Sequence, residues 1–292
     1  MPYDDIFTKA ELAFASYKKL PSTDKAKLLR TIANEIENLG DELLQIAHRE
    51  SHLPLARLTG ERGRTVNQLR LFAAHLEEGT WLEATIDTVL PDRMPLPRPD
   101  LRRMLIPLGP VVVFGASNFP LAFSTAGGDT ASALAAGCPV IYKEHPAHPQ
   151  TSQLVYSAIK TALQVCELPE GVFQHVSGGN ETGQQLVQHP QARAVAFTGS
   201  YKAGKAIFDL ACRREAPIPV YAEMGSVNPI FVLPEKAATN GEQLAEQAAQ
   251  SVLLGVGQFC TCPGLIFYPA SEATPAFLET FAEKLRDAPA EK

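Results

Sequence analysis

Short segments rich in β-branched residues alternate with longer segments of helical character between residues 110 and 224. Alternation of this kind predicts parallel strands joined by right-handed crossovers. The sequence therefore predicts an α/β fold built on an open parallel sheet with helices on both faces, in which ligands bind at the carboxyl ends of the strands. The expected strands are 110–116, 139–143, 172–176, 194–198 and 220–224, and the expected helices are 124–137, 150–166, 181–188 and 203–214.

Two further regions precede this alternation. Residues 1 to about 80 have the periodicity of amphipathic helices, with Leu28, Leu29 and Ile32 on one face. Residues 85–107 contain several prolines, which forbid a long helix and are tolerated only in edge strands or extended arms. We predict a protruding hairpin or linker there. The alternative is an ordinary loop, but a loop of about 25 residues without structure is unusual in a compact domain.

A second, smaller α/β pattern follows residue 224. It contains a strand, a helix, the turn GVGQFCTCPG, a second strand and a last helix, and the elements are expected at 228–233, 242–254, 255–264, 265–269 and 274–286. The sequence contains no internal repeat and no low-complexity segment. The sequence thus predicts a second unit that is connected to the larger sheet.

Composition and charge exclude several classes of function. The 292 residues include 26 Lys and Arg against 32 Asp and Glu, a net charge of −6, so nucleic acid and anionic membranes are poor partners. The longest apolar runs fall far short of the roughly 20 residues of a membrane helix, and the acidic N-terminal segment lacks the features of a signal peptide. The five cysteines are dispersed and odd in number, which favours a cytoplasmic protein with free thiols.

Polar residues collect at the expected strand ends. The first strand leads into Ser117 and Asn118, the second ends on Lys143, and the fourth opens into Gly199 and Ser200 ahead of a helix. A strand followed by a helix N-terminus presents unpaired backbone amides, at which a pyrophosphate can bind. The sequence therefore predicts an anion site at this edge.

Three features near these strand ends allow two interpretations each. Gly179 and Gly183 in SGGNETG let a backbone approach a ligand closely, but glycines in turns often serve the backbone alone. Lys143 is either a solvated charge or a contact to ribose hydroxyls or a 2′-phosphate. Glu223 is either a surface carboxylate at a strand end or a general base in a cleft.

Cys260 is the best candidate for a nucleophile. It lies in a turn rich in small residues, where a thiolate is accessible, whereas the other three dispersed cysteines, Cys138, Cys166 and Cys212, are predicted to be packing residues. Cys260 and Cys262 have the spacing C-x-C, which is poor for zinc, and no second Cys/His pair follows. We therefore predict no metal site.

Five motifs occur in one order along the chain: SNFP at 117–120, Lys143 after a strand, FTGS at 197–200, AEMGSVNP at 222–229 and GQFC at 257–260. Together they resemble the aldehyde dehydrogenase superfamily. Several longer stretches, among them KEHPAHPQTS and GQFCTCPG, are most similar to the branch of 2,5-dioxopentanoate (α-ketoglutaric semialdehyde) dehydrogenases and NADP-linked fatty aldehyde dehydrogenases.

The resemblance implies roles for individual residues. Cys260 matches the nucleophile that attacks the aldehyde carbon, and the side-chain amide of Asn118 with the backbone amide of Cys260 matches the oxyanion hole. Glu223 matches the base that activates water for hydrolysis of the thioester. The matched cofactor-binding residues of the Rossmann-like domain are Phe114, Gly115, Ser117, Lys143, Gly179, Gly183, Gly199, Ser200 and Met224.

The resemblance also implies a domain organisation and a cofactor. Residues 1–84 and 108–224 match the dinucleotide-binding domain, 85–107 the bridging arm used in homo-oligomer assembly, and 225–292 part of the catalytic domain. Members that prefer NAD carry an acidic residue three positions after the lysine, where this chain has Pro146, so we expect NADP, with NAD as the alternative.

The family is considerably longer than 292 residues, which implies that this chain lacks the C-terminal part of the catalytic domain. We therefore expect oxidation of an aldehyde, with 2,5-dioxopentanoate as the first substrate and fatty or medium-chain aldehydes as the alternative. A different alternative is an inactive fragment that binds only nucleotide or a partner.

Overall fold

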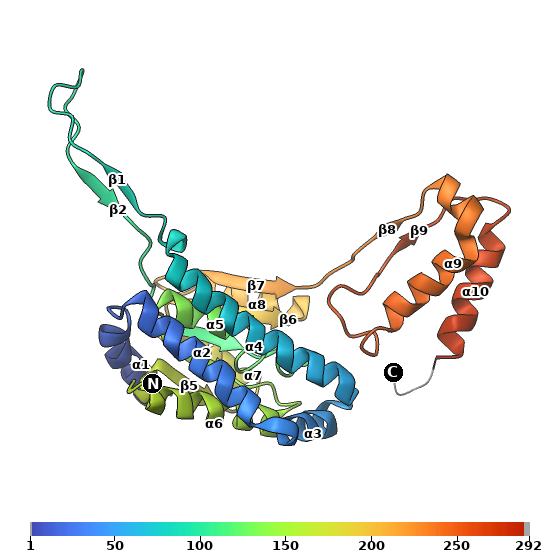
Figure 1. Cartoon of the computed structure of the whole chain (residues 1–292), viewed down its shortest axis with the longest axis horizontal. Coiled ribbons are helices and arrows are strands. Elements are labelled where there is room, and N and C mark those ends of the chain that lie inside the picture. The colour runs from blue at the N-terminus through green and yellow to red at the C-terminus, as the bar shows by residue number, and fades with distance from the viewer. Residues whose placement is uncertain (1, 289–292) are drawn as a thin grey trace.

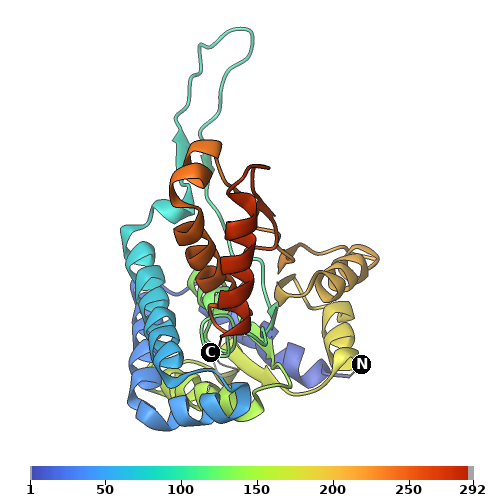
Figure 2. The ribbon, with the colours of Figure 1, turned by 90° about the vertical axis from the view of Figure 1, so that its right-hand side faces the viewer.

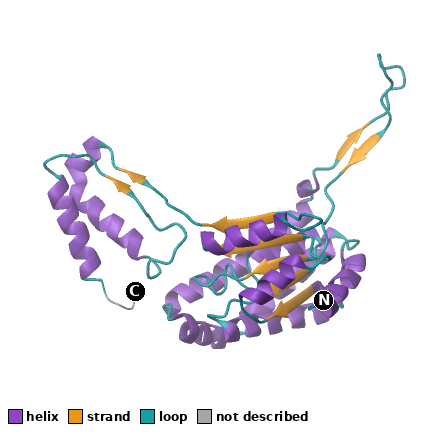
Figure 3. Ribbon diagram, turned by 180° about the vertical axis from the view of Figure 1, so that it is seen from behind, coloured by secondary structure: helices purple, strands orange, loops and turns teal. Residues whose placement is uncertain are grey.

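The computed structural model describes residues 2–288, and its centre is a five-stranded parallel sheet in the order β5-β4-β3-β6-β7. All five carboxyl ends lie at one edge of the sheet, which faces residues 225–288 in Figures 1 and 3. The predicted α/β fold with an open parallel sheet is confirmed. The strands are β3 (Val111–Phe114), β4 (Val140–Lys143), β5 (Phe173–Val176), β6 (Ala194–Gly199) and β7 (Val220–Met224).

Helices cover both faces of this sheet. Alternate residues of a strand point to opposite faces, so Val111 and Val113 of β3 join one apolar core and Val112 and Phe114 join the other. The first core is closed by α2 (Ser22–Asn38), α3 (Gly40–Ser51), α4 (Leu55–Glu78), α5 (Gly128–Ala136) and α6 (Pro149–Val165). The second is closed by α7 (Asn180–Gln188), α8 (Tyr201–Cys212) and the first half of α1 (Asp4–Tyr17). Burial on both sides explains why β3 and β4 are apolar almost throughout.

Two helices differ from their predicted bounds. Residues 124–127 form a turn and not the first turn of α5, because Gly127 lies against the chain at Ala122, where a Cβ would come within 2.5 Å of the carbonyl oxygen. Helix α9 (Pro234–Leu253) is kinked at Asn240, whose φ of −140° and ψ of 28° are not helical, so it consists of two helical segments. The second segment agrees with the helix predicted at 242–254, and the first, which begins at Pro234, is not predicted from the sequence.

Residues 85–107 form a hairpin that projects from the molecule, as predicted (Figures 1 and 2). Strands β1 (Thr85–Asp87) and β2 (Leu101–Arg103) pair antiparallel, directly after the short 3-10 helix η1 (Thr80–Leu82). A second short 3-10 helix, η2 (Glu170–Val172), precedes β5. The hairpin is exposed on both sides, and Met94 at its tip is 84% exposed.

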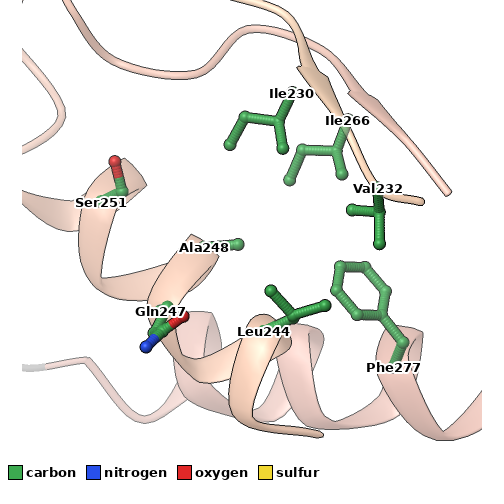
Figure 4. A pocket seen from close by; sticks show the side chains of 8 residues that line it. All are labelled: Ile230, Val232, Leu244, Gln247, Ala248, Ser251, Ile266 and Phe277. Atoms are coloured by element: carbon green, nitrogen blue, oxygen red, sulfur yellow. The ribbon is translucent and has the colours of Figure 1, made fainter. Parts of the chain in front are cut away.

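Residues 225–288 form a small α/β unit. Strands β8 (Ile230–Phe231) and β9 (Ile266–Phe267) are parallel and are covered on one face by α9 and α10 (Thr274–Arg286). A cavity of about 170 Å³ remains between this sheet and the two helices, and apolar side chains line most of it, together with Gln247 and Ser251 (Figure 4). It contains none of the predicted site residues.

The opposite face of the β8–β9 sheet is open within residues 2–288. Phe231 is 67% exposed and Phe267 50% exposed, and their rings stack with centroids 4.6 Å apart. Parallel strands are normally buried on both faces. The small unit therefore has one uncovered apolar face among the residues that the structure describes.

No helix within residues 2–288 has the length and hydrophobicity that are needed to cross a membrane.

Candidate active site

The predicted cofactor residues lie at the carboxyl edge of the large sheet or in the turns that follow it. Phe114, Lys143, Gly199 and Met224 are the last residues of β3, β4, β6 and β7. Gly115 and Ser117 follow β3, Gly179 precedes α7, Gly183 lies in its first turns, and Ser200 is the N-cap of α8. The structure therefore brings residues from distant parts of the sequence to one edge, which is where parallel sheets bind ligands.

Lys143 is buried along most of its side chain, with 8% of its surface exposed, whereas its Nζ is not among the enclosed nitrogen and oxygen atoms of the described residues. Burial lowers the pKa of its ammonium group, and the neighbouring Glu144 carboxylate opposes that effect. Within the described residues, the Lys143 Nζ has neither an ion-pair partner nor a hydrogen-bond acceptor. An accessible ammonium group with three unused donors, on a side chain that is otherwise buried, is suited to bind hydroxyl or phosphate oxygens.

Two helix N-termini complete this edge. The Ser200 hydroxyl accepts a hydrogen bond from the Ala203 backbone N–H at 3.3 Å, which caps α8. Ser200 and Gly179 are both exposed, so the first backbone amides of α8 and α7 are open to a ligand. A pyrophosphate can be held there by N–H groups and the positive ends of two helix dipoles.

Several of the predicted glycines have a packing reason. A Cβ on Gly183 would lie 2.8 Å from the Phe114 ring, and one on Gly115 would lie 2.1 Å from the Tyr142 hydroxyl oxygen. A Cβ on Gly179 would meet nothing within 4 Å. The conformationally required glycine of this turn is Gly178, with φ +144°, which the sequence analysis did not select.

Cys260 lies in the loop between α9 and β9, and it is half-buried. The loop leaves α9 through Gly255, Val256 and Gly257, which all have φ between +61° and +67°. Further along this loop, the Asn228 side-chain amide donates to the carbonyl oxygens of Cys260 at 2.7 Å and Cys262 at 3.1 Å. Asn228 thus holds the backbone around the thiol in a fixed shape.

Asn118 contacts this loop directly. Its Nδ2 donates to the carbonyl oxygen of Gln258 at 2.6 Å, which uses one of its two hydrogens. The backbone N–H of Cys260 has no hydrogen-bond acceptor within residues 2–288. The two donors that the resemblance assigns to an oxyanion hole are therefore brought to neighbouring segments, and each retains a free hydrogen.

Glu223 is exposed on β7, opposite Thr198 of β6. Among the described residues it has no hydrogen-bond or ion-pair partner, and no hydrogen bond joins it to Cys260. The next strand residue, Met224, points into the packing of α8, where its sulfur lies 2.6 Å from the Cβ that Gly204 lacks. The structure places Glu223 at the carboxyl edge of the sheet, and no hydrogen bond joins its carboxylate to the thiol among the described residues.

The sequence analysis missed two charged residues of α4 that hold the segment around Asn118. Arg57 donates to the carbonyl oxygens of Asn118 at 2.7 Å and Gly255 at 3.3 Å. Glu61, one turn later, is 5% exposed and accepts hydrogen bonds from the backbone N–H groups of Leu121 at 2.8 Å and Ala122 at 3.0 Å. Burial raises the pKa of Glu61, and these hydrogen bonds oppose the shift. The available signal was their spacing of four residues on an otherwise amphipathic helix.

Not all of the other cysteines have the burial that is predicted for packing residues. All five are free; Cys138 is buried and Cys166 half-buried, as expected of packing residues, but Cys212 is exposed at the end of α8. The prediction for Cys212 is wrong, because the helix ends there and its last turn is not covered. Exposure alone therefore does not distinguish Cys260, whereas its contacts with the Asn118 and Asn228 segments do.

The chain matches the aldehyde dehydrogenase family over residues 2–292. It is 52% identical over 279 residues to alpha-ketoglutaric semialdehyde dehydrogenase 2 of Azospirillum brasilense, covering 95% of this chain and 53% of that protein. It is 48% identical over 285 residues to alpha-ketoglutaric semialdehyde dehydrogenase of Acinetobacter baylyi, covering 98% of this chain and 54% of that protein. The solved 3,6-anhydro-L-galactose dehydrogenase in complex with NAP is similar with a TM-score of 0.80 and 26% identity, over 97% of this chain and 55% of that one.

The chain spans about half the length of the curated relatives that it matches. The matched residues nevertheless span both the large sheet and the unit that carries Cys260. By sequence and by fold, the chain belongs to the aldehyde dehydrogenase family.

Proposed function

We propose that this chain supplies the nucleotide site and the nucleophile of an NADP-linked dehydrogenase that oxidises 2,5-dioxopentanoate to 2-oxoglutarate. The observation that carries the proposal is the contact between Asn118 and the Cys260 loop, with the Asn118 Nδ2 2.6 Å from the carbonyl oxygen of Gln258. It brings an uncharged amide donor next to a cysteine with a free backbone N–H, as acyl-transfer chemistry requires. The names of the two most similar relatives given above support the choice of substrate.

The chemistry follows from these residue types. The Cys260 thiolate attacks the aldehyde carbon, and the new alkoxide accepts hydrogen bonds from the Asn118 amide and the Cys260 N–H. When bound, NADP supplies the hydride acceptor, so the carbon is oxidised to the level of a thioester. Glu223 then takes a proton from water, the resulting hydroxide attacks the thioester carbon, and the carbon–sulfur bond breaks to release the carboxylate and the thiolate.

The cofactor fits the residues present. The exposed N-termini of α7 and α8 suit a pyrophosphate, and the unpaired Nζ of Lys143 suits the adenosine ribose or a 2′-phosphate. Position 146, three residues after Lys143, is a proline, so the acidic residue that NAD-preferring members carry there, and that would repel this phosphate, is absent. These features support NADP, with NAD as the alternative.

Replacing Lys143 with methionine is expected to weaken NADP binding by about 10- to 100-fold, because a hydrogen-bonded ammonium group contributes roughly 1.5–3 kcal/mol. Isothermal titration calorimetry measures the change. Lys160→Met is the matched control, since Lys160 is an exposed lysine of α6 that pairs with Glu170 at 3.5 Å. An unchanged dissociation constant in Lys143→Met would show that the ribose is bound elsewhere.

The substrate assignment predicts that the purified chain forms NADPH with 2,5-dioxopentanoate at a higher kcat/KM than with dodecanal, and that iodoacetamide abolishes both activities. The reverse ratio would favour a fatty aldehyde dehydrogenase. If folded protein that binds NADP oxidises neither aldehyde, the alternative is supported: the chain binds nucleotide or a partner and does not turn over substrate. Circular dichroism and calorimetry separate this outcome from misfolding.

We also propose the division into a nucleotide-binding part (1–84 and 108–224), an arm (85–107) and part of a catalytic domain (225–292), with the arm used for homo-oligomer assembly. The exposed apolar side chains on the hairpin, such as Met94 and Leu96, support self-association through it.

A further inference from the structure

The guanidinium group of Arg57 lies at the junction of the two segments that the proposed reaction uses. It extends from α4 and donates through one nitrogen to the Asn118 carbonyl oxygen at 2.7 Å and through the other to the Gly255 carbonyl oxygen at 3.3 Å. Asn118 belongs to the turn after β3, and Gly255 begins the loop that leads to Cys260. One side chain therefore joins the proposed oxyanion donor to the loop of the nucleophile.

Aromatic rings hold this guanidinium in place. Its central carbon lies 4.9 Å from the centroid of the Phe119 ring and 4.7 Å from that of the Phe259 ring. The two rings also contact each other edge to face, with centroids 5.0 Å apart. Phe119 directly follows Asn118 and Phe259 directly precedes Cys260, so the rings stack against the same two segments whose carbonyl groups Arg57 binds. Cation–π contacts of this kind gain strength when they are desolvated.

The neighbouring Arg64 provides the contrast. Its central carbon lies 4.8 Å from the Phe123 centroid and 5.8 Å from the Phe119 centroid, so it packs on the same aromatic cluster. Arg64 is exposed, however, and within residues 2–288 it donates to no carbonyl group. Of these two arginines, Arg57 is the one that hydrogen-bonds to both segments in the described part of the chain.

Glu61 completes the fixation of the turn from the same helix. It binds the N–H groups of Leu121 and Ala122, while Arg57, four residues earlier, binds the carbonyl oxygen of Asn118. Two side chains of α4 therefore bind both the N–H groups and the carbonyl oxygen of this turn. Among residues 2–288 the Cys260 loop has no second polar anchor on α4, so its position relative to Asn118 depends on Arg57, on the Asn118–Gln258 hydrogen bond and on the contact between the Phe119 and Phe259 rings.

We infer that Arg57 is a positioning residue that fixes the distance between the Asn118 amide and the Cys260 backbone N–H. The inference rests on the proposed function, because those two donors matter to catalysis only if an oxyanion forms on the carbon that Cys260 attacks. Arg57 itself touches neither the substrate nor the cofactor in this scheme. Its planar fork of donors bridges two carbonyl groups, which a lysine cannot reproduce.

The test compares Arg57→Ala, Arg57→Lys and the control Arg64→Ala by hydrogen exchange with mass spectrometry and by steady-state kinetics. In Arg57→Ala, amide exchange is expected to rise at least about 10-fold in the peptides around 117–123 and 254–262. We expect kcat to fall about 100-fold, because small misplacements of catalytic groups have effects of that size. The NADP KM should not change. Arg57→Lys should be intermediate, and millimolar methylguanidinium should restore both protection and kcat in Arg57→Ala alone.

Each outcome decides the inference. Increased exchange in both peptides together with methylguanidinium rescue supports it, and unchanged exchange in either peptide overturns it. An unchanged kcat in Arg57→Ala also overturns it. If the wild-type chain turns over no aldehyde, the proposed function fails, and exchange with its rescue alone then decides whether Arg57 joins the two segments. Arg57→Lys keeps the test valid if the alanine variant does not fold.

Discussion

Replacing Cys260 with alanine is expected to abolish aldehyde oxidation, with a loss on the order of 10⁴-fold or more in kcat, because the variant lacks the thiol that we propose forms the covalent intermediate. The Asn118 amide and the backbone N–H at residue 260 remain in the variant, but they have no alkoxide to stabilise. NADPH formation followed by absorbance measures the loss. NADP binding should be unchanged, since Lys143 and the N-termini of α7 and α8 lie on the large sheet, away from the substituted side chain.

Cys262→Ala is the matched control for this experiment. Cys262 is also half-buried and lies two residues further along the same loop, but its Sγ faces the carbonyl oxygen of Val252 in α9 at 3.6 Å. Removing that thiol should leave kcat within a few-fold of wild type. If the Cys260→Ala variant turns over at the wild-type rate, or if the Cys262→Ala variant loses activity, Cys260 is not the nucleophile.

The sheet and its functional edge could be predicted from the sequence because the pattern is local. Apolar β-branched runs specify buried strands, and the residue that ends each run is placed at the edge by the strand itself. Lys143 and Ser200 follow from this rule alone. The prolines at 85–107 exclude a long helix, so a projecting segment is also predictable there, but they leave a hairpin, a linker and an ordinary loop as alternatives.

The missed features depend on contacts between distant segments. Arg57 and Glu61 have the spacing of any surface pair on a helix, and only the folded chain shows that they bind the backbone around Asn118, about 60 residues away. The same limit applies to Gly183, whose role in contact with Phe114 is packing, and to the short helical segment of α9 that precedes the kink at Asn240. Residue type and spacing predict helices and strands well. They predict contacts between side chains only where the end of a strand or helix brings those side chains together.

Replacing Glu223 with glutamine is expected to have the second large effect, which is on hydrolysis of the thioester. Glu223→Gln keeps the size and the hydrogen-bonding ability of the side chain but removes the base, so the steps before hydrolysis should proceed and deacylation should slow by about 10²- to 10⁴-fold. After mixing with 2,5-dioxopentanoate and NADP, the variant should release one equivalent of NADPH in a burst and then stop. Intact-mass spectrometry should show a single acyl adduct, and peptide mapping should locate it on Cys260.

Glu215→Gln is the control, because Glu215 is likewise exposed and follows α8 without reaching the sheet edge. It should show neither a burst nor an adduct. The burst separates the role of Glu223 from a merely structural one: a distorted site would lose both the burst and steady turnover, whereas loss of the base removes only turnover. Steady-state activity at the wild-type rate without an adduct would exclude Glu223 as the base. A persistent adduct would show that this carboxylate, which has no partner among the described residues, acts on water after the hydride has left.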